Sequence, residues 1–144
     1  MASTNLLIAH EYSPAGTQLP LAAVLDGLPW NEDGLIAAIA QQYDSGEVLM
    51  LAWMNRTALE ETLASGRVCY WSRSRRQLWR KGETSGAVQR LIEARFDCDG
   101  DALLLRVAQS GGACHTGRAS CFYNRIEGPQ VSILDSAPHP AHGA

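Results

Sequence analysis

The chain has 144 residues, of which 46% are hydrophobic and 19% are charged, and its formal net charge is −3. This length suits one domain with a real core, and the composition excludes wholesale disorder. The weak negative charge counts against a nucleic-acid binder, and the sequence has neither an apolar run as long as a membrane span nor a signal pattern. We therefore expect a soluble, cytoplasmic domain that binds neither nucleic acid nor a membrane.

Both ends of the chain are loosely patterned. Residues 1–33 scatter three prolines among apolar residues. We predict an N-terminal extension there, which packs on the domain or frays, with a short helix near residues 21–28. The domain itself is predicted over residues 34–134. Residues 135–144 hold two further prolines and are predicted to form a disordered tail.

A hairpin and a helix are the first regular elements predicted inside the domain. The hairpin is expected over residues 35–54, where two apolar stretches flank a short turn that ends in glycine. The helix is expected over residues 55–64. Thr57 and Glu60 have the spacing of a capping box at its start, and Gly66 is placed to end it.

The remaining predicted elements are strands. Four runs rich in β-branched or aromatic residues are bounded by glycine, aspartate or serine: 68–72, 88–96, 102–108 and 121–126. Strands in succession with one or two short helices indicate the α+β class, mainly β. We expect a compact arrangement of mixed or antiparallel strands.

An acidic segment, Asp97-Cys98-Asp99-Gly100-Asp101, connects two of these strands. Three carboxylates so close together repel one another unless a cation or solvent offsets the charge. Oxygen ligands at this spacing suit Mg²⁺ or Ca²⁺. An EF-hand loop is excluded, because alanine occupies positions 102 and 108, where that loop needs glycine and glutamate. An exposed acidic turn without an ion remains the alternative.

Cys98, Cys114 and Cys121 lack the paired Cys-x-x-Cys spacing of structural zinc sites. Three thiolates leave one place of a tetrahedral zinc open, which is typical of catalytic sites, where bound water ionises at a pH of about 7. Buried core cysteines are the alternative. Cys121 beside Phe122 fits that alternative, whereas Cys114, after two glycines, does not.

His115 directly follows Cys114. Adjacent side chains diverge, so this histidine cannot easily share a metal with Cys114. A lone histidine is more often structural, but this one lies between a cysteine and a Thr-Gly-Arg turn. Its position favours a general acid or base that moves protons for water at the metal.

Residues 67–86 interleave arginines with Tyr70, Trp71 and Trp79. Such a stretch can bind single-stranded nucleic acid, or a single nucleotide with an aromatic ring for the base and arginine or serine for phosphate. Residues 81–86 are similar to a phosphate-cradling loop but lack the P-loop pattern. A solvated charged hairpin is the alternative, against which the two tryptophans argue.

Four motifs together resemble the phosphoribosyl-AMP cyclohydrolase family of histidine biosynthesis. They are residues 71–75, 78–86, 97–101 and 114–118, within a resemblance that runs from about residue 35 to residue 126 without gaps. Gly112 departs from the family's usual proline. The resemblance implies hydrolytic opening of the adenine ring of 1-(5-phosphoribosyl)-AMP between N1 and C6. The product is a formimino aminoimidazole carboxamide ribonucleotide, made in the third step of the pathway.

The same resemblance implies the cofactors and the assembly. One zinc per subunit would be held by Cys98, Cys114 and Cys121. One Mg²⁺ would be held by Asp97, Asp99 and Asp101. The protein would be an obligate homodimer with its zinc site shared across the interface, one subunit supplying Cys98 and its partner the other two cysteines.

The resemblance also implies roles around the substrate. His115 would be catalytic, and Mg²⁺ would neutralise substrate phosphate. The substrate-binding residues come from the basic stretch and from the turn after Cys114: Trp71, Ser72, Arg73, Ser74, Lys81, Glu83, Thr84, Ser85 and Arg118.

A zinc module that binds RNA or single-stranded DNA through residues 67–81 is the alternative from another class. It needs a closed metal site with Cys69 as a fourth ligand. Cys69 lies outside the motifs and is interpreted as a buried strand residue. A nucleobase deaminase is excluded, because the chain lacks the His-x-Glu and Pro-Cys-x-x-Cys pattern.

Overall fold

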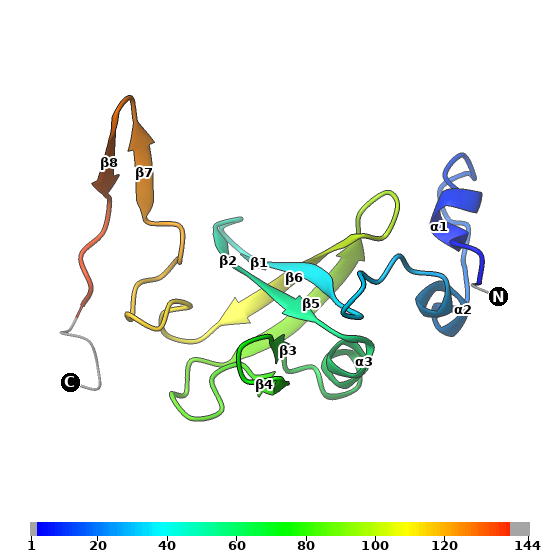
Figure 1. The fold of residues 1–144 in the computed structure, drawn as a ribbon, viewed down its shortest axis with the longest axis horizontal. Coiled ribbons are helices and arrows are strands. Elements are labelled where there is room, and N and C mark those ends of the chain that lie inside the picture. The colour runs from blue at the N-terminus through cyan, green and yellow to red at the C-terminus, as the bar shows by residue number, and fades with distance from the viewer. Residues whose placement is uncertain (1–2, 139–144) are drawn as a thin grey trace.

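Two β-hairpins lie side by side and form the main sheet in a computed structural model, which describes residues 3–138 (Figure 1). Each hairpin is antiparallel, and the two join through parallel pairing of β1 with β6. The strand order is β2-β1-β6-β5, with β1 at Ile36–Gln42, β2 at Val48–Met54, β5 at Gln89–Phe96 and β6 at Ala102–Gln109. The predicted α+β, mainly β class with mixed strands is confirmed, as is the first hairpin.

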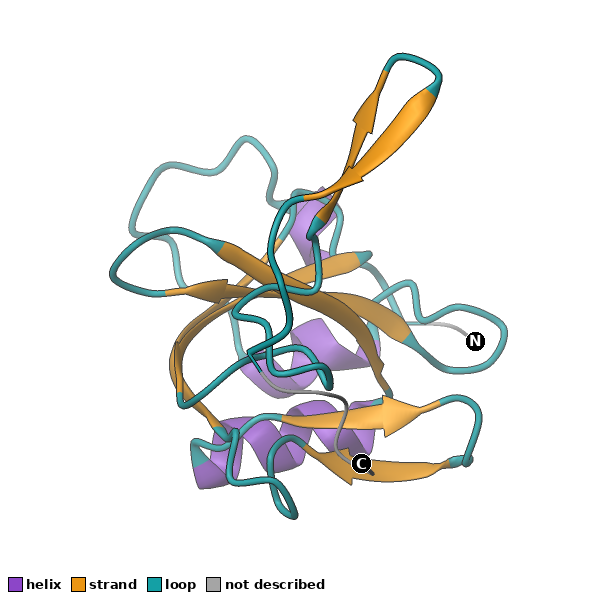
Figure 2. Ribbon diagram, turned by 90° about the vertical axis from the view of Figure 1, so that its left-hand side faces the viewer, coloured by secondary structure: helices purple, strands orange, loops and turns teal. Residues whose placement is uncertain are grey.

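One face of this sheet carries the core. Side chains alternate along the two central strands, so every second residue is buried. The inward positions are Ile36, Ala38 and Ala40 of β1 and Leu103, Leu105 and Val107 of β6. Helix α3 and the small hairpin of β3 and β4 lie on one side of the sheet (Figure 2). The site described below lies where that hairpin meets the edge strand β2.

Helix α3 (Arg56–Ser65) begins two residues earlier than the predicted capping box. Its N-cap is Asn55, whose side-chain oxygen accepts a hydrogen bond from the Ala58 amide over 2.8 Å. The Thr57–Glu60 box was therefore wrong, because the helix is capped by Asn55 and Thr57 already lies inside its first turn. Gly66 ends the helix as predicted, in the left-handed conformation with φ of 76°.

The N-terminal segment packs on the domain rather than fraying. The predicted short helix is present as α2 (Leu21–Asp26), and Val24, Leu25 and Leu28 belong to the buried core. A second helix, α1 (Leu6–Ala9), was not predicted, because four residues carry too little periodicity to be recognised. The two helices lie against each other (Figure 1).

Two small hairpins complete the fold. One pairs β3 (Cys69–Ser72) with β4 (Gln77–Arg80), and the other pairs β7 (Asn124–Glu127) with β8 (Gln130–Ile133). The second projects away from the body of the subunit (Figures 1 and 2). The strand predicted over residues 121–126 was therefore wrong at its start, because the Cys121 amide instead donates to the Leu49 carbonyl at 2.7 Å.

The predicted tail is described only in part. Residues 135–138 contain no helix or strand, and residues 139–144 lie outside the described range. Within residues 3–138, no helix is both long and apolar enough to cross a membrane.

Candidate active site

The segment that follows β6 is tied to the edge strand β2. The Cys121 amide donates to the Leu49 carbonyl over 2.7 Å, and the Ser120 hydroxyl donates to the Val48 carbonyl over 2.8 Å. These bonds use main-chain acceptors of the exposed edge of β2. They bring Cys121 to the strand that also forms one wall of a pocket.

A tight turn holds Cys114 close to Cys121. The Gly117 amide donates to the Cys114 carbonyl over 2.9 Å, and the Cys114 amide donates to the Arg118 carbonyl over 3.1 Å. Within this turn the Thr116 hydroxyl donates to the Cys114 sulfur over 3.1 Å. The two thiols lie close enough for each to alter the other's pKa. Two of the three predicted zinc ligands therefore meet in a single chain.

The pKa values of the two thiols are shifted in opposite directions. Burial raises the pKa of Cys114, but hydrogen bonds from Thr116 and Cys121, with the charge of Arg118, outweigh it and leave that pKa below its ordinary value. Burial and the neighbouring Cys114 raise the pKa of Cys121 to about 11. The Cys114 thiolate is therefore favoured over that of Cys121, and ionising both thiols calls for additional positive charge. A thiolate pair of this kind fits a soft divalent cation such as zinc.

Lys81 contributes positive charge near Cys121, where it lowers the pKa of that thiol against the larger effect of burial. Only 8% of it is exposed, and its Nζ donates to the Ala87 carbonyl over 3.2 Å. Burial lowers the pKa of Lys81, and the negative charge of Cys121 and Cys114 opposes that effect. The loop that follows Lys81 carries three exposed predicted substrate residues: Glu83, Thr84 and Ser85.

A pocket of about 580 Å³ opens between β2 and the β3–β4 hairpin. Four predicted substrate residues line it: Trp71, Ser72, Arg73 and Ser74. The rest of its wall comes from Leu51, Ala52, Trp53 and Trp79. The Arg73 guanidinium lies 4.9 Å from the centre of the Trp53 ring. The pocket thus combines aromatic faces with a cation and hydroxyls, as a nucleotide site requires.

Trp53 was missed by the sequence analysis. It lies two residues after Leu51 on β2, so both side chains point away from the buried face. Large apolar residues at outward positions of an edge strand were the available signal. Their meaning depended on knowing that the β3–β4 hairpin lies beside them.

The acidic segment forms the turn between β5 and β6, as predicted. Asp97 accepts hydrogen bonds from the amides of Gly100 at 2.9 Å, Asp101 at 3.0 Å and Ala102 at 3.3 Å. Each aspartate of the trio Asp97, Asp99 and Asp101 has a carboxylate oxygen within 4.8 Å of one from the other two. The side chains are therefore close enough to share one hard cation.

Crowding of these carboxylates raises the pKa of Asp101 and leaves that of Asp97 lowered. A hydrogen bond with Asp97, then one with Asp99 and the repulsion of both charges, raise the pKa of Asp101 to about 6. Burial raises the pKa of Asp97, but the hydrogen bonds from Asp101 and the turn amides outweigh it, and the net direction is down. Negative charge therefore accumulates at this turn, an environment that suits a hard cation such as Mg²⁺.

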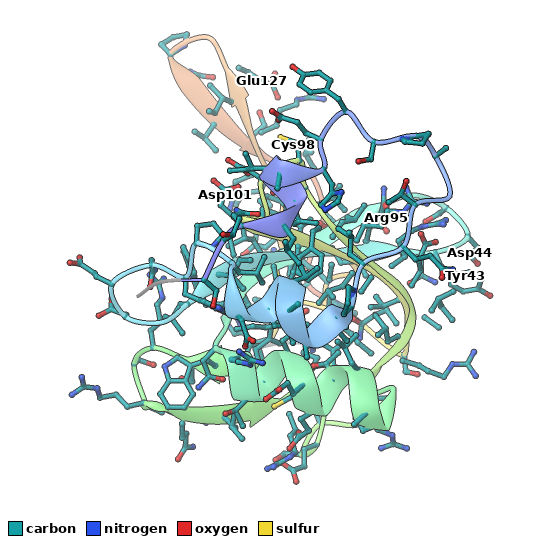
Figure 3. The ribbon with its side chains drawn as sticks, turned by 90° about the vertical axis from the view of Figure 1, so that its right-hand side faces the viewer. Tyr43, Asp44, Arg95, Cys98, Asp101 and Glu127 are labelled. Carbon is teal, nitrogen blue, oxygen red and sulfur yellow. The ribbon has the colours of Figure 1, made fainter. Side chains whose placement is uncertain are left out.

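Cys98 is exposed in this same turn and lies far from the other two cysteines along the sheet. It precedes β6, whereas Cys114 and Cys121 follow it. The 8 residues of β6 span about 25 Å at the usual rise of an extended strand. Figure 3 shows Cys98 and Asp101 beside α1. Within one described chain, the predicted three-cysteine set is therefore not assembled.

The remaining predicted site residues differ in their placement. His115 is exposed and directly follows Cys114 in the turn. Arg118 faces the C-terminal segment: its Nε donates to the Asp135 carbonyl over 2.6 Å, and its guanidinium lies 3.8 Å from the Tyr123 ring centre. Cys69 is fully buried in β3, where burial raises its pKa to about 12. Its interpretation as a buried strand residue is confirmed.

Comparison with known proteins places these features in a family. The family model described as phosphoribosyl-AMP cyclohydrolase matches residues 50–123. A Pseudomonas fluorescens protein named phosphoribosyl-AMP cyclohydrolase 2 is 70% identical over 130 residues, which are 90% of this chain and 88% of that one. Relatives named phosphoribosyl-AMP cyclohydrolase from Alkalilimnicola ehrlichii and Alcanivorax borkumensis are 68% and 64% identical, over 86% and 90% of this chain and 87% and 90% of theirs. As its four motifs predicted, the chain belongs to the phosphoribosyl-AMP cyclohydrolase family of hydrolases.

Proposed function

We propose that this protein is a zinc-dependent hydrolase that opens the adenine ring of 1-(5-phosphoribosyl)-AMP in histidine biosynthesis. Family membership supports the substrate and the pathway. The observation that carries the proposal is the meeting of two thiols, Cys114 and Cys121, near Lys81. The Lys81 ammonium lies 6.0 Å from the ring centre of Trp79, which lines the aromatic pocket. His115 lies in the same turn as the first thiol.

The proposed zinc ligands are Cys114, Cys121 and Cys98 of the partner subunit. Thiolates suit zinc, and three protein ligands leave room for water. When bound, zinc would supply a Lewis acid that lowers the pKa of the attacking water. The hydrogen bond from Thr116 to Cys114 supports this ligand set, because it stabilises the charged form of a sulfur that must bind as a thiolate.

A homodimer is part of the same proposal. The length of β6 separates Cys98 from the thiol pair, and a twofold axis exchanges the two ends of this strand between copies. The projecting β7–β8 hairpin exposes 80% of Ile126, 61% of Val131 and 67% of Ile133. A two-stranded hairpin with apolar side chains in water is marginal alone and is stabilised by packing against another surface.

The bond changes in the proposed reaction are few. The oxygen of one water bonds to C6, and the bond between C6 and N1 breaks. C6 keeps its amino group and becomes a carboxamide, while N1 keeps its phosphoribosyl group, gains a proton and stays attached to C2 as the formimino nitrogen. His115 would take a proton from the attacking water and deliver one to N1.

The pocket residues would hold the rest of the nucleotide. Trp71 and Trp53 offer faces to the purine ring, and Arg73, Ser72 and Ser74 offer donors to phosphate. The exposed loop of Glu83, Thr84 and Ser85 and the side chain of Arg118 remain predicted substrate contacts. Mg²⁺ on Asp97, Asp99 and Asp101 would neutralise phosphate charge, and this trio would reach the partner's site together with Cys98.

A direct assay tests the proposal. Purified protein is incubated with 1-(5-phosphoribosyl)-AMP and Mg²⁺ in ¹⁸O-water, with and without a zinc chelator, and the product is analysed by mass spectrometry. We expect one ¹⁸O in the carboxamide group, loss of turnover with the chelator, and recovery when zinc is restored. Label elsewhere would place the bond cleavage at another atom, and full turnover after zinc removal would contradict the metal.

A further inference from the structure

Asn5 joins the N-terminal helix to the turn that carries Cys98. Its side-chain oxygen caps α1, accepting from the amides of Leu7 at 3.0 Å and Ile8 at 3.3 Å. Its Nδ2 donates to the Asp99 carbonyl over 2.8 Å, a contact between residues 94 positions apart. The Asn5 side chain therefore joins two parts of the chain: its oxygen caps α1, and its nitrogen holds the backbone of the residue next to Cys98.

Apolar packing fixes the same turn from the same side. Gly100 is buried with φ of +78°, and a Cβ there would lie 2.6 Å from Leu28 Cδ2 and 2.8 Å from Leu7 Cδ1. Leu7 belongs to α1 and Leu28 follows α2, so the N-terminal helices close over the turn (Figure 3). Leu28 is itself part of the buried core, which gives this contact a rigid base.

Residues 4 and 5, which precede α1, pack closely against the end of α2. A Cβ on Gly27 would clash with the carbonyl oxygen of Thr4, so only glycine lets residues 4 and 5 pass against the end of α2. The position of Asn5 is therefore set by the core helix α2 and not by α1 alone. These contacts connect the rigid core helix to the exposed turn that carries Cys98 and so restrict the motion of that turn.

We propose that residues 4–28 are a clamp that positions the Cys98 turn for zinc, with Asn5 as its positioning residue. The inference rests on the proposed function, because it takes Cys98 as a zinc ligand. Cys98 is exposed, and its direction is set by the turn backbone, which the Asn5 donor and the Gly100 packing hold. Loss of the clamp widens the range of directions of Cys98 and weakens zinc binding without removing a ligand.

Asn5→Asp isolates the clamp from the helix cap. Aspartate keeps an acceptor for the Leu7 and Ile8 amides but has no donor for the Asp99 carbonyl. Asn31→Asp is the matched control, because Asn31 likewise accepts from two amides, Asp33 at 2.9 Å and Leu35 at 2.9 Å. Asn5→Ala removes cap and donor together and shows what loss of the helix adds.

Three measurements compare the variants. Amide hydrogen exchange is followed in the metal-free protein at Gly100, Asp101 and Ala102, whose amides bond to Asp97. Zinc affinity is measured by competition with a chromophoric chelator, and stability by urea unfolding. For Asn5→Asp we expect these amides to exchange about fivefold faster than in Asn31→Asp, the effect of one lost hydrogen bond. We expect the zinc affinity of Asn5→Asp to be about fivefold weaker for the same reason. The urea midpoint of Asn5→Asp should lie below that of Asn31→Asp by no more than the loss of one hydrogen bond explains.

The outcomes separate the clamp from the proposed function. Equal exchange at the three amides in Asn5→Asp and Asn31→Asp would overturn the clamp, as would faster exchange with unchanged zinc affinity. Cys98→Ser tests the ligand itself. If that variant keeps the zinc affinity of the native protein, the ligand assignment fails, and with it the role of the clamp toward zinc, even where exchange at the turn is faster.

Discussion

Thr116 donates its hydroxyl hydrogen to the sulfur of Cys114 over 3.1 Å, from the turn that also carries His115. The bond stabilises the negative charge of that sulfur and is among the causes that lower its pKa against the opposing effect of burial. The turn therefore prepares one of the proposed zinc ligands and holds the proposed proton carrier beside it.

Thr116→Val removes the hydroxyl donor and keeps the shape of the side chain. We expect zinc affinity to fall about fivefold, the effect of one lost hydrogen bond to sulfur. Chelator competition measures it, and Thr116→Ser, which keeps the donor, serves as the control. Equal affinity in the valine and serine variants would show that the hydroxyl has no role in holding the metal.

Mixing two inactive variants tests the shared zinc site. Cys98→Ser and Cys114→Ala should each lose zinc and activity. After joint unfolding and refolding, half of the dimers should be mixed, and each mixed dimer should have one intact site of two. Activity should therefore recover to about a quarter of the native level by the symmetry of the dimer. No recovery in a mixture of folded dimers would contradict a site built from two chains.

Asp99→Asn tests the acidic turn. Removing one of three carboxylate ligands should leave zinc content unchanged and raise the Mg²⁺ concentration for half-maximal activity by roughly tenfold or more, since even changes outside a ligand shell have that effect. Asp33→Asn, at an exposed position, is the control. An unchanged Mg²⁺ dependence would contradict the assignment of this turn to the metal.

Ile126→Asp tests the projecting hairpin. Ile126 is 80% exposed, so the substitution should leave the subunit's circular dichroism unchanged. Placing a charge in the proposed dimer interface should shift the protein from dimer to monomer, as measured by light scattering on a sizing column at one concentration. Ser45→Asp adds the same charge at an exposed turn and should remain a dimer. A dimer that tolerates both substitutions would place the interface elsewhere.

Glu61→Gln tests an ion pair between α3 and β4. Arg80 donates to Glu61 over 2.8 and 2.9 Å and lowers the pKa of that carboxyl below its ordinary 4.5. A pKa lowered by folding stabilises the folded protein above the ordinary value, and this stabilisation is lost as pH falls through the folded value. Urea unfolding should show a small deficit for Glu61→Gln at neutral pH that disappears in acid. Glu32→Gln, at an exposed position, should show no such pH-dependent difference.

Local chemistry made much of the fold predictable. Two apolar stretches on either side of a short turn identified both strands of the first hairpin, and Gly66 ended α3 because the left-handed conformation favours glycine. The Thr57–Glu60 box failed because a motif match does not show which of two nearby caps is used, and the helix is capped by Asn55, two residues earlier. The family resemblance predicted the stretch from Trp71 to Ser74 as substrate contacts, and these residues line the pocket.

The sequence by itself determined the family, through four ordered motifs, and the residue types that fit zinc, Mg²⁺ and a nucleotide. Only the tertiary structure decided which of them meet. Parallel pairing of β1 with β6 puts Cys98 at one end of the sheet and Cys114 with Cys121 at the other. Packing of the β3–β4 hairpin beside β2 puts Trp53 on the pocket wall, and packing of the N-terminal segment puts Asn5 against Asp99. Such distances depend on strand order, which is set by contacts between residues far apart in the chain and leaves no mark on local patterns.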